Sequence, residues 1–299
     1  MVWSPDYCWL TLGTPHYVLK NGVREVVSRL AASFQNVHLS SAIVSIRPDP
    51  QDPSLVALEC VDGQVYSGFH HLVFATQASS AVPLLGTYMA NLPSDAETQR
   101  AAVMAQIRCL KSFKYRTTIV INHTDESLLP EAEHDRRDLN LVTSGWTADE
   151  EVDESLCVDA SFTMATQIQK PPPGSPPNVS NVYQTTNPFV PPRKDRIISV
   201  SSLERAVLDL DAKAALAGLC EVKRSRWGFW RREPDCALGS LQGAGGRFDK
   251  GTTGVWICGS YAHQGIPLLE GCVVSAKNVV VEGILQKEGL KLREEPWSI

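Results

Sequence analysis

The sequence lacks the features that direct a chain into or across a membrane. No apolar run approaches the roughly 20 residues of a bilayer-spanning helix, and Met1 to Asp6 lack the basic and apolar regions of a signal peptide. An excess of positive charge is also missing, since the net charge is −5, which gives no attraction to nucleic acid or to an anionic membrane. With 43% hydrophobic and 20% charged residues, the composition is typical of a soluble globular protein. We therefore expect a cytoplasmic protein with no membrane and no nucleic acid as partner.

Paired cysteine motifs are missing as well. The eight cysteines form no Cys-x-x-Cys pair and are dispersed along the chain, at Cys8, Cys60, Cys109, Cys157, Cys220, Cys236, Cys258 and Cys272. In an intracellular protein this spacing favours reduced, mostly buried thiols over a disulfide framework or a zinc site. The sequence therefore predicts no metal site. Gly-x-Ser-x-Gly is also absent, which disfavours a serine hydrolase.

The most informative stretch that is present runs from Gly254 to Ala276. The apolar run Val255–Cys258 predicts a buried strand that ends at Gly259-Ser260, and a helix is expected to begin near Leu269-Glu270-Gly271. The apolar face of this helix contains Val273, Ala276, Val280, Gly283 and Ile284. Glycine at the strand end and in the first helical turn would let another molecule approach the backbone, and free N–H groups at a helix N-terminus attract an anion or a polar carbonyl. The stretch therefore predicts a cofactor seat, with an ordinary strand–turn–helix unit as the alternative.

The N-terminal third predicts a helix followed by short strands. The helix, Val23–Phe34, has one apolar stripe made of Val23, Val26, Val27, Leu30, Ala31 and Phe34. Short strands are expected at Val37–Leu39 and Ala42–Ile46. Asp62-Gly63 predicts a hairpin between Leu55–Val61 and Gln64–Tyr66. His71–Ala75 then predicts a buried strand.

The middle of the chain predicts a mostly antiparallel sheet. Ser94–Glu97 matches a capping box, which predicts a helix to about Leu110. Strands are expected at Phe113–Asn122, Leu139–Val142, Val158–Ile168 and Val182–Thr186, and their polar connections lack βαβ spacing. A proline-rich loop is expected at Lys170–Pro177. Ser201–Glu204 is expected to begin a helix with Leu203, Ala206, Val207, Leu210 and Ala214 on one side.

The stretch Gly254–Ala276 resembles the C-terminal flavin-binding motif of the FAD-dependent amine-oxidase-like superfamily, which includes amine oxidases, protoporphyrinogen oxidase and phytoene desaturases. The resemblance implies that Gly259 and Ser260 lie beside the pyrophosphate and ribityl chain, although many relatives carry Asp or Glu at the Ser260 position. It also implies that the helix beginning at Glu270, Gly271 and Cys272 points at the pyrimidine edge of the flavin. The further implied contacts are Ile43 near the adenine and Ala75 and Thr76 near the cofactor. Tyr261 and His263 lie between the predicted strand and helix, where their side chains could face a bound flavin; the alternative is a turn whose side chains pack in the core or face solvent.

The resemblance implies an α/β fold of the FAD/NAD(P)-binding type, incomplete, with an inserted mostly antiparallel α+β substrate domain. Residues 16–92 and 250–290 would form the partial FAD-binding domain and residues 93–249 the substrate-type domain, with terminal segments at 1–15 and 291–299. The implied activity is an amine-oxidase-like or desaturase-like removal of hydride from a small organic substrate to flavin N5.

One element of that family pattern is missing before Tyr17, namely a strand, a Gly-x-Gly-x-x-Gly turn and a helix that hold the pyrophosphate. Gly243–Gly246 is a poor match and is interpreted as a loop. Charge-assisted contacts contribute about 1.5–3 kcal/mol each, so we expect weak or no FAD binding by this chain alone. Two hypotheses follow: an FAD-dependent oxidoreductase truncated at its N-terminus and present without its first Rossmann element, or a catalytically inactive remnant that acts as a binding or scaffold protein and could pair with a separate chain supplying the missing Rossmann half.

Other candidate residues each have a plainer interpretation. Trp227–Trp230 could line an apolar cavity beside the flavin, or belong to the core. Lys114 and Arg116 could contact substrate, or face solvent. His123–Glu126 resembles a metal cluster only superficially, and loop polarity is the expected reason for it. Cys272, in the first helical turn, is expected to have a somewhat lowered thiol pKa.

Overall fold

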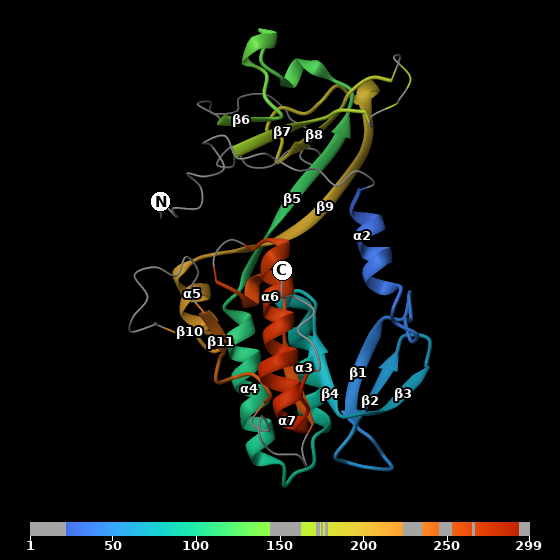
Figure 1. The fold of residues 1–299 in the computed structure, drawn as a ribbon, viewed down its shortest axis with the longest axis vertical. Helices are drawn as coiled ribbons and strands as arrows, with labels where there is room; N and C mark the ends of the chain where they lie inside the picture. Colours follow the sequence, from blue (N-terminus) through green and yellow to red (C-terminus); the bar gives the residue numbers. More distant parts are fainter. Residues whose placement is uncertain are drawn as a thin grey trace.

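The computed structural model describes residues 22–143, 163–171, 174, 176, 179–223, 235–244, 253–264 and 267–292. These residues form both helices and strands, which confirms that the fold belongs to a mixed α/β class. Figure 1 shows a lower lobe of helices around a small parallel sheet and an upper lobe built on an antiparallel sheet. The long strands β5 and β9 run from the lower lobe into the upper one. The Trp227–Trp230 segment lies outside the described residues.

A parallel pair of strands lies at the centre of the lower lobe. Strand β4 (His71–Phe74) pairs in parallel with β12 (Gly254–Ile257); both strands were predicted from their apolar runs, whereas their pairing was not. The other edge of β12 is closed by side-chain amides, because Gln242 Oε1 accepts from Ile257 N at 2.9 Å and Gln242 Nε2 donates to Ile257 O at 2.8 Å. Gln106 Nε2 likewise donates to Val255 O at 3.0 Å. Among the described residues, no strand pairs with the other edge of β4.

Helices pack around this pair and complete the lower core. They are α3 (Ala78–Asn91), α4 (Glu97–Lys111), α5 (Leu210–Leu216), α6 (Leu269–Asn278), the π-helical turn η5 (Val279–Ile284) and α7 (Leu285–Glu288). The predicted last helix is confirmed, and Gly289 ends it with φ 69°, as expected for a C-terminal glycine. The capping box is wrong, because α4 begins at Glu97 after Ala96 and has no side-chain cap. Residues from α3 and α4 belong to one apolar core, so the predicted boundary at 92/93 falls between two packed helices.

The N-terminal described region forms a helix and a three-stranded antiparallel sheet. The helix α2 (Gly22–Ala31) begins one residue before the predicted start and ends three residues before the predicted end, and the expected strand at Val37–Leu39 is absent. The sheet consists of β1 (Ile43–Pro48), β2 (Val56–Cys60) and β3 (Val65–Phe69). The predicted hairpin is confirmed, with Gly63 at φ 81° in its turn. The apolar stripe of α2 is exposed, at 57% for Val23, 56% for Val27 and 67% for Leu30.

The upper lobe contains the antiparallel sheet that the sequence predicted. Its order is β6-β7-β8-β5-β9, and every neighbouring pair is antiparallel. The strands are β5 (Lys114–His123), β6 (Leu139–Thr143), β7 (Thr163–Gln169), β8 (Val182–Thr186) and β9 (Ile197–Val207). Short 3₁₀ turns connect them, at η1 (Glu126–Leu128), η2 (Glu133–Asp135) and η3 (Lys194–Arg196).

The helix expected to begin at Ser201–Glu204 is wrong. This segment belongs to β9, which pairs with β5 from Ile197 opposite His123 to Val207 opposite Lys114. The helix α5 begins only at Leu210, after Asp209 accepts a hydrogen bond from Ala212 N at 2.8 Å. The long ladder satisfies the backbone of β9, so tertiary pairing overrides a spacing that also fits a helix.

Candidate functional site

Two of the predicted cofactor segments lie side by side at the C-terminal edge of the parallel pair. Ala75-Thr76 follows β4 and Gly259-Ser260 follows β12, and Cys258 N donates to Phe74 O at 3.0 Å between them. Ala75 and Thr76 are exposed, whereas Gly259 and Ser260 are half-buried. Ligands of open parallel sheets bind at the carboxyl ends of the strands. This edge is therefore the candidate site.

The turn after β12 is held by the helix that follows it. Gly259 has φ 146°, a conformation that favours glycine, and a Cβ there would lie 3.1 Å from the Tyr261 ring. Gly259 N donates to Ser275 Oγ at 3.0 Å, and Ser275 Oγ lies 3.1 Å from Gly259 O. The backbone polar groups of Gly259 are thus used within the chain, which fixes the position of Ser260 at the edge.

The N-terminal end of α6 is open on one side and packed on the other. Its N-cap residue, Leu268, makes no side-chain capping bond, and Leu268, Leu269 and Glu270 are exposed. On the inner side, a Cβ added to Gly271 would lie 3.2 Å from Ser260 O and 3.3 Å from His263 Cβ. The glycine at 271 therefore lets the helix pack closely on the chain's own turn, and that contact accounts for it without a ligand.

Two residues expected to face a flavin lie in the 3₁₀ turn η4 (Ser260–Ala262) and just after it. Tyr261 is buried in the core, with its ring centroid 5.1 Å from that of Phe113, and burial raises the pKa of its phenol. Its hydroxyl has no hydrogen-bond partner among the described residues. His263 is half-buried, and its Nδ1 is likewise buried without a partner there.

The remaining predicted cofactor residues are distributed around the lower lobe. Ile43 begins β1 opposite Cys60, in the separate three-stranded sheet. Cys272 is a free, half-buried thiol in the first turns of α6. Burial raises the pKa of the Cys258 thiol to about 11, and the charge of Cys272 adds to the effect. The structure therefore brings Ala75, Thr76, Gly259 and Ser260 together at one edge, whereas Ile43 lies in another sheet.

The candidates of the middle region have structural partners. Lys114 Nζ lies 2.7 Å from Asp209 Oδ2 and 3.3 Å from Asp211 Oδ2, in ion pairs at the surface. His123 is fully buried and hydrogen-bonded to Thr185 Oγ1 at 2.8 Å. Asp125 accepts from Arg193 N at 2.8 Å and from Ser127 N at 3.1 Å. These contacts agree with the plainer interpretation of His123–Glu126.

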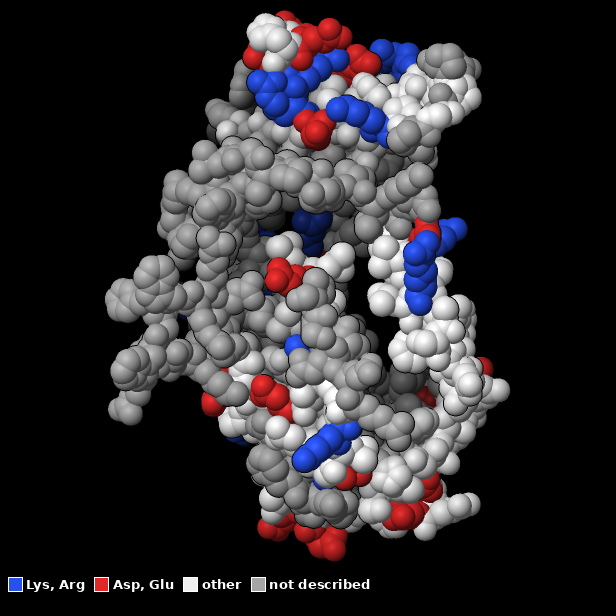
Figure 2. Space-filling view, viewed as in Figure 1, with Lys and Arg blue, Asp and Glu red and all other residues white. Residues whose placement is uncertain are grey.

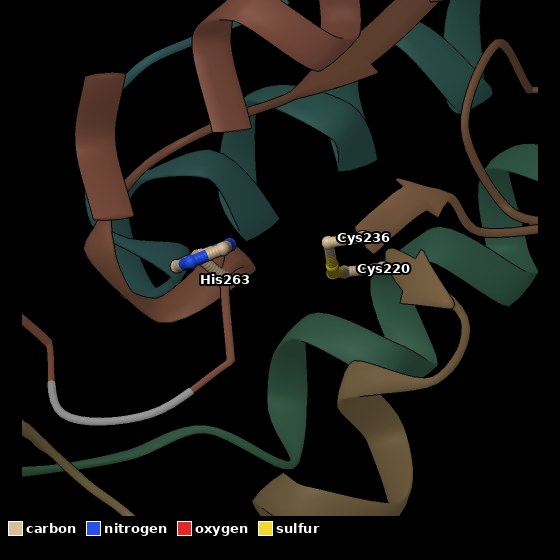
Figure 3. Close-up of side chains that lie close together, drawn as sticks. All are labelled: Cys220, Cys236 and His263. Atoms are coloured by element: carbon tan, nitrogen blue, oxygen red, sulfur yellow. A yellow bond between two sulfur atoms is a disulfide. The ribbon is translucent and has the colours of Figure 1, made fainter. Parts of the chain in front are cut away.

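The expectation that the cysteines are unpaired thiols is wrong for two of them. Cys220 and Cys236 form a disulfide between β10 (Cys220–Lys223) and β11 (Asp235–Leu238). Antiparallel pairing puts Val222 opposite Cys236 and Leu238 opposite Cys220, which brings the two cysteines to diagonal positions of one small hairpin. Their separation of 16 residues in the sequence gave no such signal. Figure 3 shows His263 facing this pair.

Sequence reasoning also missed a pocket in the upper lobe. Its volume is about 500 Å³, and its lining includes Leu128, Leu139, Met164, Phe189, Val190 and Arg137. Its lining combines residues of strands β6 and β7 with residues of the connecting segments, which come together only in the folded sheet. On the face shown in Figure 2, acidic and basic side chains are interspersed at the top of this lobe.

Comparisons with known proteins add no family assignment: neither a scan against family models nor a search of curated proteins finds a match to this chain. In the part of the chain that the structure describes, no helix has both the length and the apolar character needed to cross a bilayer.

Proposed function

We propose that this chain forms part of an FAD-dependent oxidoreductase of the amine-oxidase-like type, which removes hydride from a small organic substrate. The observation that carries the proposal is the C-terminal edge of the parallel pair, where Ala75-Thr76 and Gly259-Ser260 lie side by side. Helices α3 and α6 follow the two segments, an arrangement that suits a cofactor at the carboxyl ends of parallel strands.

The base of the upper sheet lies next to this same edge, which supports the proposal that the sheet forms one side of the substrate-binding site. Gln77 Nε2 donates to Glu204 O of β9 at 2.9 Å, and Ala78 N donates to Tyr115 Oη of β5 at 2.7 Å. Both bonds join the start of α3 to the base of the upper sheet. A substrate bound between the sheet and the edge would thus lie beside the proposed cofactor.

The uncapped backbone N–H groups and exposed side-chain groups at this edge could form hydrogen bonds with the polar part of a flavin. The first-turn N–H groups of α6 have no side-chain cap, so they can donate to an anion or a carbonyl. Ser260, Thr76 and Glu270 would make further polar contacts with the flavin. Ile43 and Cys272 would contact the cofactor farther from this edge. When bound, the flavin supplies a hydride acceptor at N5. The chain's contribution is to orient it, with Gly259, Gly271 and Tyr261 holding the turn.

An open strand edge and an exposed helix stripe support the need for a further dinucleotide-binding unit. Among the described residues, β4 has a strand on one side only. The apolar stripe of α2 faces outward, and Figure 2 shows an opening beside this helix at the right of the molecule. A Rossmann half from a longer product or from a partner chain would add a parallel strand to β4 and cover apolar surface.

Flavin titration of the purified chain tests the proposal in two steps. Alone, the chain is expected to bind FAD weakly or not at all, because three lost charge-assisted contacts at about 1.5–3 kcal/mol each would weaken binding by orders of magnitude. A stoichiometric yellow complex would contradict the need for a further unit. If a strand–Gly-x-Gly-x-x-Gly–helix unit is supplied, by an N-terminally extended product or by a co-purifying chain, we expect one FAD per complex.

A pair of matched variants locates the flavin in that complex. Ser260→Leu adds bulk at the proposed edge and should lower FAD content, measured by flavin absorbance, whereas Ser67→Leu on the exposed surface of β3 should leave it unchanged. Equal FAD content in both variants would show that the flavin does not bind at the C-terminal edge of the parallel strands.

The second candidate function is a catalytically inactive remnant that binds or scaffolds another protein. The exposed stripe of α2 favours it, since an unpaired apolar helix face suits a protein contact. Under this hypothesis a partner co-purifies without flavin, and Val27→Glu releases it. Flavin reduction by any small amine or alkene-forming substrate in the completed complex would exclude the inactive remnant.

A further inference from the structure

We propose that Cys220, Cys236 and His263 form a Zn²⁺ site when the disulfide between the two cysteines is reduced. Their ligand atoms all lie within 4.8 Å of one another, and they are the one such group of possible metal ligands in the described part of the chain. The site uses none of Ala75, Thr76, Gly259 and Ser260, which carry the proposed flavin site, although His263 is also one of the two residues expected to face a flavin.

The donor set suits zinc in chemistry and in size. Zinc prefers thiolate and imidazole ligands, with Zn–S distances of about 2.3 Å and Zn–N of about 2.0–2.1 Å. A tetrahedral ion therefore holds two sulfurs about 3.8 Å apart and each sulfur about 3.6 Å from the nitrogen. The Cα atoms of Cys220 and Cys236 are 6.0 Å apart, so rotation of the side chains can separate the sulfurs without moving the strands.

The side chain of His263 has a buried polar atom that lacks a hydrogen bond within the described part of the chain. Its Nδ1 is buried and has no hydrogen-bond partner in the described residues. A buried ring nitrogen without a partner loses the hydrogen bonds that water would provide. Figure 3 shows the ring facing the two sulfurs from the opposite segment. A zinc ion between them would satisfy the imidazole.

Two of the three ligands contact helix α6, and the third is held by the β10–β11 hairpin. Asn278 Nδ2 of α6 donates to Cys236 O at 2.8 Å. His263 packs against Gly271 of α6, where a Cβ would lie 3.3 Å from His263 Cβ. Cys220 follows Leu219, whose carbonyl accepts from Gly239 N at 3.0 Å just after β11. The ligand backbones are thus fixed before any metal arrives, which lowers the entropic cost of binding.

The reaction balances with a dithiol reductant and a zinc ion. The reductant transfers two electrons and two protons to the disulfide and becomes a disulfide itself, which leaves two thiols on the chain. Zinc then binds both sulfurs and releases the two thiol protons. Because Cys220 is buried, pairing two thiolate charges with one divalent cation favours the complex over free thiolates. Three protein ligands leave a fourth position for water.

Metal titration of the full chain tests the site. The chain is stripped of metal with a chelator, reduced with a phosphine under anaerobic conditions, and titrated with Co²⁺, whose visible bands and sulfur charge-transfer band report tetrahedral thiolate ligation. We expect one Co²⁺ per chain, displaced by one Zn²⁺, and no binding by the oxidised chain. A reduced chain that binds neither ion would overturn the proposal.

Variants identify the ligands. Cys220→Ser, Cys236→Ser and His263→Ala should each weaken zinc binding by more than the roughly 10–100-fold that loss of a supporting residue costs. Cys109→Ser is the matched control, since it removes a buried thiol outside the cluster and keeps a donor for Ala215 O. Unchanged affinity in all three ligand variants would contradict the site.

Alkylation of the unsubstituted chain tests the same ligands even if some of the variants do not fold. Zinc should protect Cys220 and Cys236 from alkylation by iodoacetamide in the reduced chain, as read by peptide mass spectrometry. Protection of other cysteines in their place would overturn the assignment.

Discussion

The two lobes bury their centres in different ways. The lower core consists of apolar side chains from the parallel pair and the helices around it, including Leu72, Phe74, Leu85, Leu110 and Val255. In the upper sheet, the side chains of His123, Thr166 and Thr185 are each 0% exposed. Thr185 Oγ1 lies 2.8 Å from His123 Nε2 and 2.9 Å from Thr166 Oγ1. The lower core is thus mainly apolar, with the buried amides of Gln106 and Gln242 bonded to β12, whereas the upper sheet has a chain of side-chain hydrogen bonds beside apolar side chains such as Ile121.

The comparison teaches which changes each lobe should resist. A packed apolar core has no room for extra atoms, so added volume is costly there. A set of buried, hydrogen-bonded side chains tolerates a change in side-chain volume better than the loss of one hydrogen-bonding group, because that loss leaves the remaining groups unsatisfied. The upper sheet should also respond to pH, because a histidine lies within its chain of bonds.

The largest effect is expected from Gly283→Ala in the π-helical turn of the lower lobe. A Cβ at Gly283 would lie 2.4 Å from Cζ3 of Trp256, and Trp256 is fully buried. We expect a loss of about 3 kcal/mol in the free energy of unfolding, since overpacking displaces the ring or the helix. Urea denaturation followed by tryptophan fluorescence measures it. A change under about 0.5 kcal/mol would show that the core can shift more freely than a packed one should.

The next effect tests one of the two buried glutamine side chains that bond the backbone of β12 in the lower core. Gln242→Leu removes the amide that bonds both the N–H and the carbonyl of Ile257. Two buried backbone groups then lose their partner, and we expect a loss of about 2 kcal/mol in unfolding free energy. Gln64→Leu in the exposed hairpin is the control and should change it by less than about 0.5 kcal/mol. Similar losses in the two variants would mean that Gln242 does not close the edge of β12.

The upper sheet should be sensitive to loss of a hydroxyl of nearly constant volume. Thr185→Val leaves His123 and Thr166 without their shared partner. We expect a loss of about 1.5 kcal/mol, measured by thermal unfolding. Thr117→Val, at an exposed position of β5, is the control and should be neutral within about 0.5 kcal/mol. If the two variants unfold alike, the polar centre does not stabilise the sheet.

Acid should weaken both lobes through one histidine in each. Burial lowers the pKa of His123 and of His71 below the ordinary value. In each ring Nδ1 accepts a hydrogen bond, from Asp125 N at 3.1 Å and from Trp256 Nε1 at 3.2 Å, so protonation at Nδ1 breaks it. The unfolded chain binds the proton more readily, so this stability is present above about pH 6.5 and is lost as the pH falls toward the lowered folded pKa.

Unfolding free energy measured across this pH range checks the direction. His123→Gln and His71→Gln should each flatten part of the slope between neutral pH and pH 5. A slope that is unchanged in both variants would assign the acid sensitivity to other groups.

The smallest effect is a gain of stability in the lower lobe. Gly86 lies within α3 in an ordinary helical conformation, and a Cβ there would have nothing within 4 Å. Gly86→Ala should therefore add about 0.5–1 kcal/mol. It is also the matched control for Gly283→Ala, because both put the same methyl group into a helix. A loss at Gly86 would mean that space at the helix surface is tighter than the structure indicates.

The sequence predicted elements whose signal is local. The hairpin at Asp62-Gly63 and the strands β4 and β12 with the helix after β12 were predicted from turn residues and apolar runs, and they are confirmed. The helix α3 was not predicted, and Pro83 in its interior argues against a helix on local grounds. The strand β9 was mistaken for a helix because its partner β5 lies about 80 residues earlier and no local pattern reports that pairing.

The candidate site was predictable only in outline. Ala75-Thr76 and Gly259-Ser260 were both singled out, and the parallel register brings them together. The burial of Tyr261 against Phe113 could not be predicted, because it depends on how α4 and β5 approach the turn. The Cys220–Cys236 pair with His263 depends equally on tertiary packing, since its members come from a hairpin and from the turn after β12.

The parallel pair has a consequence for how the chain acquires its fold. Strands β4 and β12 are about 180 residues apart in sequence, so closing that loop is an entropically costly and late event. The antiparallel strands of the upper lobe are closer together in the chain and can pair sooner. During synthesis β4 is made long before its partner leaves the ribosome. The edge where Ala75 and Gly259 meet therefore cannot form until β12 has been synthesised.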